Sequence, residues 1–416
     1  MLPDLVNTIN TFGDTSEVPI PSSLIDQIIG QDHAVEVVRL AASQRRFILI
    51  AGEPGTGKSL LGQAASEIMK SHDLVDVIAY ENKENRNMPL IRLAKAGQSQ
   101  TIVENEMIRQ KRSLMSELFL IYSAFIAVPL CGLFYYLRDR EIFWILGSVF
   151  LMVILWRVRQ WILRRIDNKV PKVLVSNSNI AHVPFVDATG SRDGALFGDV
   201  RHDPYQSGGM ETPPHMLLEA GAIHRAHGGV LYIDEAAVLS PESQQNLLTA
   251  IQTKIMPIMG RSPGSSGTLI RSHPLPCDFM LIMAGNFEDI EKIHPALRSR
   301  IKGYGYEIST KICMPVTEKN TLKLIQFIAQ EVCRDGKIPH FSSEGIKEIL
   351  MEAVLRSDVP DNYTLRLREL GGLVRISGDI ALKEGYAMIE KDHVRTAVKY
   401  AKSIEEQRNE DKFNDA

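Results

Sequence analysis

The sequence has little of several features that would place it in familiar classes of protein. Its 416 residues include four cysteines, and none of these belongs to a C-x-x-C pair or lies near a histidine at metal-ligand spacing. A disulfide framework or a zinc site is therefore not expected, and a reducing compartment is the simpler interpretation. The formal net charge is −3, so no nucleic-acid partner is expected. Residues 1–38 lack the basic segment and the apolar core of a signal peptide.

The residues that are present predict an α/β domain after an irregular arm. Residues 1–29 contain three prolines, which interrupt any long element. The next predicted elements are a helix, an apolar strand and a second helix, over residues 31–44, 47–51 and 60–69. A strand, a glycine-rich turn and a helix in succession are typical of the opening of a parallel α/β fold.

The turn after this predicted strand is the most specific motif in the chain. It matches the phosphate-loop pattern G-x-x-x-x-G-K-[ST] in full. Its glycines let backbone N–H groups turn toward phosphate oxygens, while Lys58 would reach the β- and γ-phosphates and Ser59 would bind Mg²⁺. The N-terminus of the next helix favours the same anion. The predicted site for ATP and Mg²⁺ is formed by Gly52, Glu53, Pro54, Gly55, Thr56, Gly57, Lys58 and Ser59.

Two later strand ends predict the other half of this site. The apolar run 230–233 ends in Asp234 and Glu235. Asp234 would hold Mg²⁺ through water, and Glu235 would polarise the attacking water. Many strands end in acids, so this pattern alone is weak evidence; together with the phosphate loop it is strong evidence for a nucleotide site. Asn286 follows the apolar run 279–285 and would align the attacking water, although asparagine at a strand end is also a common turn residue.

Two arginines lie in the segment His-Pro-Ala-Leu-Arg-Ser-Arg, at residues 294–300. Phosphoryl transfer gains from an arginine placed on the developing negative charge, often by a neighbouring subunit. Either Arg298 or Arg300 would serve in this role. A surface salt bridge is the alternative for each of them.

Two apolar runs interrupt the predicted α/β domain. Residues 118–137 and 142–156 carry no charge, and four charged residues separate them. About 20 apolar residues cross a bilayer as a helix, and the second run reaches that length if Arg157 and Arg159 snorkel to the headgroups. We therefore expect a transmembrane hairpin over residues 114–163; a buried helical hairpin is the alternative. Basic residues flank both outer ends, which places the ATPase on the cytoplasmic side of the cell membrane.

Downstream of residue 315 the pattern becomes helical. Helices are predicted over residues 317–334, 342–356, 364–384 and 391–408. We expect an α/β nucleotide-binding domain over residues 30–314, a small helical domain over 315–408 and a tail over 409–416.

Together these motifs resemble the AAA+ ATPases, and more narrowly the ATPase half of the archaeal, membrane-anchored (B-type) Lon proteases. The likeness covers about residues 20–408 and includes the position of the hairpin between the phosphate loop and the acids. It is carried by residues 188–190, 198–204, 206–209, 223–227, 244–250 and 297–306. The resemblance implies a P-loop AAA+ parallel sheet core with an inserted two-helix hairpin and a C-terminal helical lid.

The family resemblance also implies roles for single residues. Asn286 resembles the first sensor. Arg298 or Arg300 resembles the arginine finger, and the wider class favours Arg300. Arg368 resembles the second sensor on the lid, with Arg375 as the next candidate.

The same resemblance implies a ring, by analogy a hexamer, that pulls unfolded or membrane proteins through its pore. Tyr205 lies where Lon-like proteins place an aromatic pore-loop residue; a packed loop tyrosine is the alternative. The family's Ser-Lys peptidase domain has no counterpart in these residues. The alternatives are a stand-alone membrane remodelling ATPase and a degenerate scaffold, and the intact motifs disfavour the scaffold.

Overall fold

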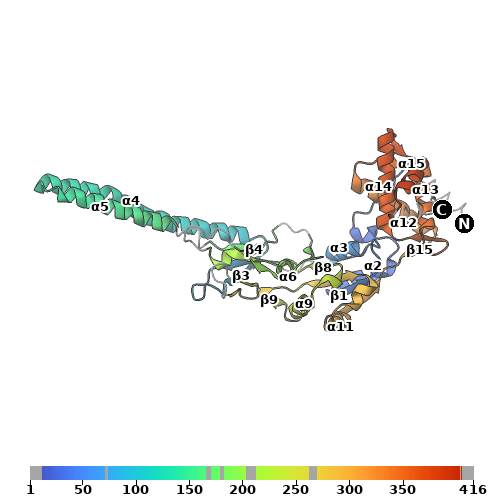
Figure 1. Cartoon of the computed structure of the whole chain (residues 1–416), viewed down its shortest axis with the longest axis horizontal. Helices are drawn as coiled ribbons and strands as arrows, with labels where there is room; N and C mark the ends of the chain where they lie inside the picture. Colours follow the sequence, from blue (N-terminus) through green and yellow to red (C-terminus); the bar gives the residue numbers. More distant parts are fainter. Residues whose placement is uncertain are drawn as a thin grey trace.

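The molecule is elongated and consists of three parts in a row. The computed structural model describes residues 12–70, 74–164, 170–178, 182–202, 212–261, 269–402 and 404. A long helical hairpin forms one end, the α/β domain lies in the middle, and the C-terminal helices form the other end (Figure 1).

The middle domain is built on a five-stranded parallel sheet. Its strand order is β14–β1–β13–β8–β5, which are Gly305–Ser309, Phe47–Ala51, Met280–Gly285, Val230–Ile233 and Phe185–Asp187. All residues of β13 and β8 are buried. Strands covered on both faces read as continuous apolar runs, which is why sequence patterns revealed them.

Helices cover both faces of this sheet. Along β13, Ile282 packs with α2 (Asp32–Gln44) and α3 (Lys58–Ile68), whereas Met283 packs with α9 (Pro241–Thr253) and α11 (Pro295–Tyr304). Successive strand residues point to opposite faces, so one apolar run supplies both cores. The sheet is therefore the middle layer of three, as a parallel sheet requires.

A second, antiparallel sheet carries the hairpin, and no pattern in the sequence predicted it. Its order is β3–β2–β4, which are Leu90–Lys95, Val75–Tyr80 and Lys172–Val175. The hairpin leaves this sheet after β3 and returns before β4. Both ends of the hairpin are thus joined to one small sheet, which lies between the hairpin and the nucleotide-binding core.

The hairpin consists of α4 (Ser99–Asp139) and α5 (Phe143–Arg164). Helix α4 begins well before the predicted residue 114, because the polar segment ahead of the apolar run continues the same helix. The two helices pack on each other, with the Tyr135 and Trp144 rings stacked at 4.8 Å. Both are long and apolar enough to cross a membrane.

The C-terminal domain contains four helices around its own core. They are α12 (Glu318–Asp335), α13 (Ser343–Leu355), α14 (Leu367–Glu384) and α15 (Lys391–Tyr400). Helix α15 ends at Tyr400 rather than at the predicted residue 408; residues 403 and 405–416 lie outside the described part. Thr317 and Ser342 cap α12 and α13 with their hydroxyl oxygens, which explains where those helices begin.

Residues 12–18 of the predicted N-terminal arm pack on this helical domain. Thr15 donates its backbone N–H to the carbonyl of Phe341 at 3.1 Å, and Val18 joins the apolar core of the domain. Residues 12–18 therefore contribute to the C-terminal domain.

Short elements complete the chain. They are η1 Leu24–Gln27, α6 Asp193–Phe197, β6 Asp199–Val200, α7 Pro214–Leu217, β7 Leu218–Glu219, α8 Ala222–Arg225, η2 Ala236–Val238, β9 Ile255–Met256, β10 Met259–Arg261, β11 Leu269–Arg271, β12 Leu275–Pro276, α10 Phe287–Glu291, β15 Cys313–Pro315, β16 His340–Phe341, β17 Asn362–Thr364 and β18 Met388–Ile389.

Candidate functional site

A cavity of about 630 Å³ lies between the α/β domain and the helical domain. The phosphate loop forms its floor, and the carboxyl ends of β8 and β13 add polar residues. The helical domain closes it from the other side. Predicted site residues among its lining are Pro54, Gly55, Thr56, Gly57, Lys58, Ser59, Asp234, Glu235, Asn286, Arg368 and Arg375. Residues from four separate stretches of sequence therefore meet in one place.

The glycines of the phosphate loop are required by its shape. Gly55 and Gly57 have φ of +82° and +90°, which side chains with a Cβ rarely adopt. A Cβ on Gly52 would lie 1.8 Å from the Thr310 hydroxyl oxygen. Added side chains would strain or displace this loop, so its conformation fits the cradle that backbone N–H groups form around phosphate.

Lys58 is buried at the first turn of α3, directly after the loop. Its ammonium donates to the carbonyls of Gly52 at 2.8 Å and Glu53 at 3.0 Å. Burial lowers the pKa of Lys58, while the charge of Asp234 opposes that shift. The ammonium is thus held inside the loop, within reach of an anion that approaches the cradle.

The two predicted Mg²⁺ ligands meet at a tyrosine. The Tyr232 hydroxyl lies 3.3 Å from the Ser59 hydroxyl and 3.3 Å from a carboxylate oxygen of Asp234. Burial raises the pKa of Tyr232, so its proton is retained. Oxygen donors at the base of a phosphate loop suit Mg²⁺. The residues present therefore fit the ion.

Tyr232 was missed because it was read only as part of an apolar strand. The available signal was its position two residues before Asp234. Side chains at i and i+2 lie on the same side of a strand, so the phenol and the carboxylate point the same way.

Glu235 has an unusual backbone conformation beside this site. Its φ of +51° places it in the left-handed region, where a residue with a Cβ is strained. Its side chain is exposed and contributes to the wall of the cavity. Such strain clusters at functional sites, and here it turns a carboxylate from the end of β8 toward the cavity.

Asn286 directly follows β13 and lines the cavity. Its backbone N–H donates to a carboxylate oxygen of Asp289 at 3.2 Å, and both residues line the cavity. Asp289 was not predicted. It stands three residues after Asn286 at the start of α10, the spacing of a capping pair.

The two lid arginines differ in their surroundings. The Cβ of Arg368 would lie 2.8 Å from a Cβ built on Gly55, which places this residue against the phosphate loop. Arg375 pairs with the buried carboxylate of Glu331, which also pairs with Arg334 at 3.3 Å. Arg368 has no ion pair among the described residues. Its guanidinium is therefore the more available of the two for a bound anion.

The other two predicted arginines lie outside the cavity. On α11, Arg298 pairs with Glu307 at 3.2 Å, and the Arg300 guanidinium lies 3.9 Å from the ring centre of Tyr304. Tyr205, the predicted pore-loop residue, lies outside the described residues.

Comparison with known proteins agrees with these motifs. Residues 181–296 match the family described as LonB-like, AAA domain, and residues 24–123 match magnesium chelatase, subunit ChlI. The archaeal Lon protease of Thermococcus kodakarensis is 49% identical over 408 residues, which cover 95% of this chain and 62% of that protein. The archaeal Lon protease of Archaeoglobus fulgidus is 50% identical over 396 residues, covering 95% and 63%.

A third relative is similar to this chain over most of its own length. The putative lon protease homolog of Thermoplasma volcanium is 36% identical over 464 residues, which cover 96% of this chain and 92% of that protein. This chain spans about three fifths of the other two relatives. The predicted family is confirmed: the chain belongs to the archaeal Lon protease family, and the part of that family which it represents is an AAA+ ATP hydrolase.

Proposed function

We propose that this chain is the motor of a membrane-anchored Lon-type machine, which uses ATP hydrolysis to unfold and translocate protein substrates. The observation that carries the proposal is the meeting of the phosphate loop, the acids at the end of β8 and Arg368 of the lid around one cavity. A site shared by two domains changes shape when either domain moves. Nucleotide turnover can therefore drive motion of the lid.

Each residue around the cavity takes one role in this proposal. Ser59 and Asp234 would hold Mg²⁺, which would neutralise charge on the phosphates. Glu235 accepts the proton of the attacking water, and Asn286 aligns that water. Arg368 contacts the phosphates from the lid.

The arginine finger that the family resemblance implies on α11 supports a ring assembly. An arginine that stabilises the transferring phosphoryl group must reach it, and neither α11 arginine reaches the cavity of its own chain. A neighbouring subunit would supply it. Arg300 is favoured because its guanidinium has no ion pair among the described residues, whereas the Nε of Arg298 already pairs with Glu307.

The membrane anchor is the α4–α5 hairpin. Phe119 is 72% exposed and Phe150 is 68% exposed, values that a hairpin buried in a protein core would not show. The apolar part of each helix is about as long as a bilayer is thick. Because both ends return to one sheet, the ATPase lies on a single side, which charge asymmetry predicts to be cytoplasmic.

Glu235→Gln tests the chemistry directly. The variant should bind ATP with nearly normal affinity, while hydrolysis falls by about 10²- to 10³-fold because the base is lost. Nucleotide binding is followed with a fluorescent ATP analogue and turnover by phosphate release. Glu242→Gln, on the exposed first turn of α9, is the matched control. Turnover that survives the Glu235 change would show that another group activates the water.

Mixing two inactive variants tests the ring. Glu235→Gln and Arg300→Ala subunits each lose turnover alone. A mixed ring contains sites that combine an intact Glu235 with an intact Arg300 from the neighbour, so part of the activity should return. If Arg300→Ala keeps turnover alone, while Arg298→Ala loses it and regains it on mixing with Glu235→Gln, the finger is Arg298.

The second candidate is a stand-alone membrane remodelling ATPase without proteolysis. The intact mass of the protein from its native membranes separates the two candidates. A mass well above 46.5 kDa, or a stoichiometric peptidase partner, indicates a protease motor; a mass of 46.5 kDa without one indicates the remodeller.

A further inference from the structure

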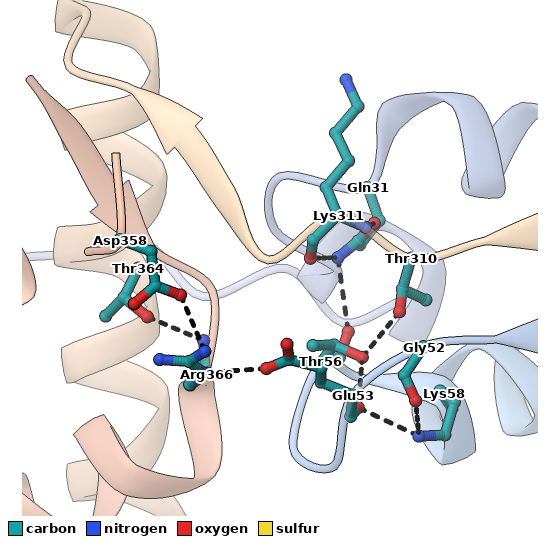
Figure 2. A network of polar contacts seen from close by, with 10 residues as sticks. All are labelled: Gln31, Gly52, Glu53, Thr56, Lys58, Thr310, Lys311, Asp358, Thr364 and Arg366. Carbon is teal, nitrogen blue, oxygen red and sulfur yellow. Dashed lines mark hydrogen bonds and ion pairs between the residues drawn. The ribbon is translucent and has the colours of Figure 1, made fainter. Parts of the chain in front are cut away.

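An ion pair joins the phosphate loop directly to the helical lid. The Arg366 Nε donates to a carboxylate oxygen of Glu53 at 2.9 Å, and its Nη2 donates to Asp358 at 2.8 Å (Figure 2). Glu53 is the second residue of the phosphate loop, and Arg366 immediately precedes α14. The contact with Asp358 stays within the helical domain, whereas the contact with Glu53 crosses between domains.

Glu53 also contacts Lys58, the proposed phosphate-binding lysine, through its backbone carbonyl. Its carbonyl accepts from the Lys58 ammonium at 3.0 Å and from the Thr56 hydroxyl at 2.8 Å. One residue therefore receives Lys58 on its carbonyl and Arg366 on its carboxylate. A shift of Glu53 that changes its contact with Lys58 would therefore also change its contact with Arg366.

The far side of the loop is fixed to the linker that leads into the lid. The hydroxyls of Thr56 and Thr310 lie 2.7 Å apart. Gln31 donates to the carbonyl of Lys311 at 2.8 Å and accepts from the N–H of Lys311, also at 2.8 Å (Figure 2). Residues 310 and 311 lie between β14 and β15, where the α/β domain ends. The phosphate loop is therefore hydrogen-bonded to the linker between the two domains and ion-paired with the helical lid.

We propose that Glu53 and Arg366 form a latch that couples occupancy of the phosphate loop to the position of the lid. The proposal rests on the phosphate-binding role assigned above to Lys58. A bound phosphate attracts the Lys58 ammonium and draws it from the Glu53 carbonyl. The loop then shifts at Glu53, and the carboxylate moves Arg366 and the start of α14 with it.

Arg366 is a positioning residue in this account, because it acts through Glu53 and not on the nucleotide. Arg368 lies two residues further along the same segment. A latch at Arg366 therefore holds Arg368 against the phosphate loop. Loss of the latch lets the lid swing outward, which weakens nucleotide retention more than it slows the chemical step.

The test compares Arg366→Gln with Arg356→Gln in the full-length chain. Arg356 is the matched control, since its side chain is similarly buried (24% against 28% exposed) and its ion pair with Glu352, on the last turn of α13, stays inside the helical domain. Arg366→Gln should raise KM for ATP and the release rate of a fluorescent ADP analogue by about three- to fivefold, the value of one partly exposed ion pair. The kcat should change by less than about twofold, and Arg366→Lys should restore part of the loss.

Two further variants separate a latch from a general structural role. Asp358→Asn removes only the contact inside the lid, so it should leave ADP release close to normal. Glu53→Gln and Arg366→Gln should each speed release, and the double variant should be no faster than either, because both remove one interaction.

The latch is overturned if Arg366→Gln behaves like Arg356→Gln, or if the effects of the Glu53 and Arg366 changes simply add. If Arg366→Gln does not fold, the isosteric Glu53→Gln paired with Asp358→Asn gives the same decision. Failure of the proposed function looks different: Lys58→Ala would then keep normal ATP binding and turnover.

Discussion

The nucleotide-binding core and the hairpin contain similar apolar residues in opposite surroundings. Every residue of β13 is buried between helices on both faces of the sheet. Most large apolar residues of α5 are exposed, including Phe143 at 70% and Phe150 at 68%. Helix α4 packs along α5. The difference teaches that an apolar run indicates burial but not what covers it: here helices cover one run, and in our proposal lipid covers the other.

Truncating one apolar side chain in each region tests this contrast most strongly. Ile282→Ala in β13 should lower the free energy of unfolding by about 3–4 kcal/mol, because it leaves a cavity in a covered sheet. Phe150→Ala in α5 should change it by less than about 0.5 kcal/mol, since no protein core loses a contact there.

Unfolding of the core in denaturant is followed by the loss of binding of a fluorescent ATP analogue. All three tryptophans, Trp144, Trp156 and Trp161, lie in the hairpin, so their emission reports that region separately. A destabilisation by Phe150→Ala as large as that by Ile282→Ala would show that the hairpin packs into a protein core after all.

Acid should weaken the core and spare the hairpin. Burial lowers the pKa of His224 to about 4, from an ordinary value near 6.5. Its Nε2 lies 3.1 Å from the Met256 carbonyl and its Nδ1 accepts from the Gly221 N–H, so the ring is held neutral. The unfolded chain binds this proton more readily. The stabilisation is therefore complete above about pH 6.5 and is lost as pH falls toward 4, by up to about 3 kcal/mol.

Unfolding of the core at about pH 7 and pH 5 checks this prediction. His224→Gln should flatten the slope, while His33→Gln, on the exposed face of α2, should leave it unchanged. In His224→Gln, the free energy of unfolding should still fall with acid, but less steeply. His215 and His227 cause this remaining slope, because burial lowers the pKa of each of them as well. An unchanged slope in His224→Gln would show that these other groups account for the acid sensitivity.

A smaller effect is expected where the two regions join. Asp76 of β2 is fully buried and accepts from the N–H of Ser99, at the start of α4, at 3.0 Å and from the N–H of Asn177, just after β4, at 2.7 Å. Burial opposes its ionisation, but these hydrogen bonds outweigh burial and hold the pKa of Asp76 below its usual value. One carboxylate thus fastens both ends of the hairpin.

Asp76→Asn should cost about 2 kcal/mol locally, because the amide cannot accept all of these hydrogen bonds. Hydrogen exchange at the amides of Ser99 and Asn177 should speed up, while the nucleotide cavity stays protected. Asp139→Asn, at the exposed far end of α4, is the control. Equal exchange in both variants would mean that the sheet holds the hairpin without Asp76.

Local patterns predicted much of the fold and of the site. The phosphate loop, Asp234, Glu235 and Asn286 were predictable because each lies next to a buried apolar strand, and short-range chemistry marks such strand ends. Tyr232 and Asp289 were not, because a tyrosine inside an apolar strand and an aspartate near a helix start carry no distinctive pattern. The β3–β2–β4 sheet was missed for a similar reason. Its strands β3 and β4 are partly exposed, and β4 lies across the hairpin from the other two.

The sequence by itself determined the chemistry of the chain: a nucleotide loop, a strand ending in acids, a helical C-terminal domain and two long apolar helices. These depend on backbone preferences and on residues adjacent in the chain. Only the tertiary structure decided which arginine faces the phosphate loop, that Arg366 reaches Glu53, and that Asp76 holds both ends of the hairpin. Those contacts join residues far apart in sequence, and packing of whole domains determines their distances.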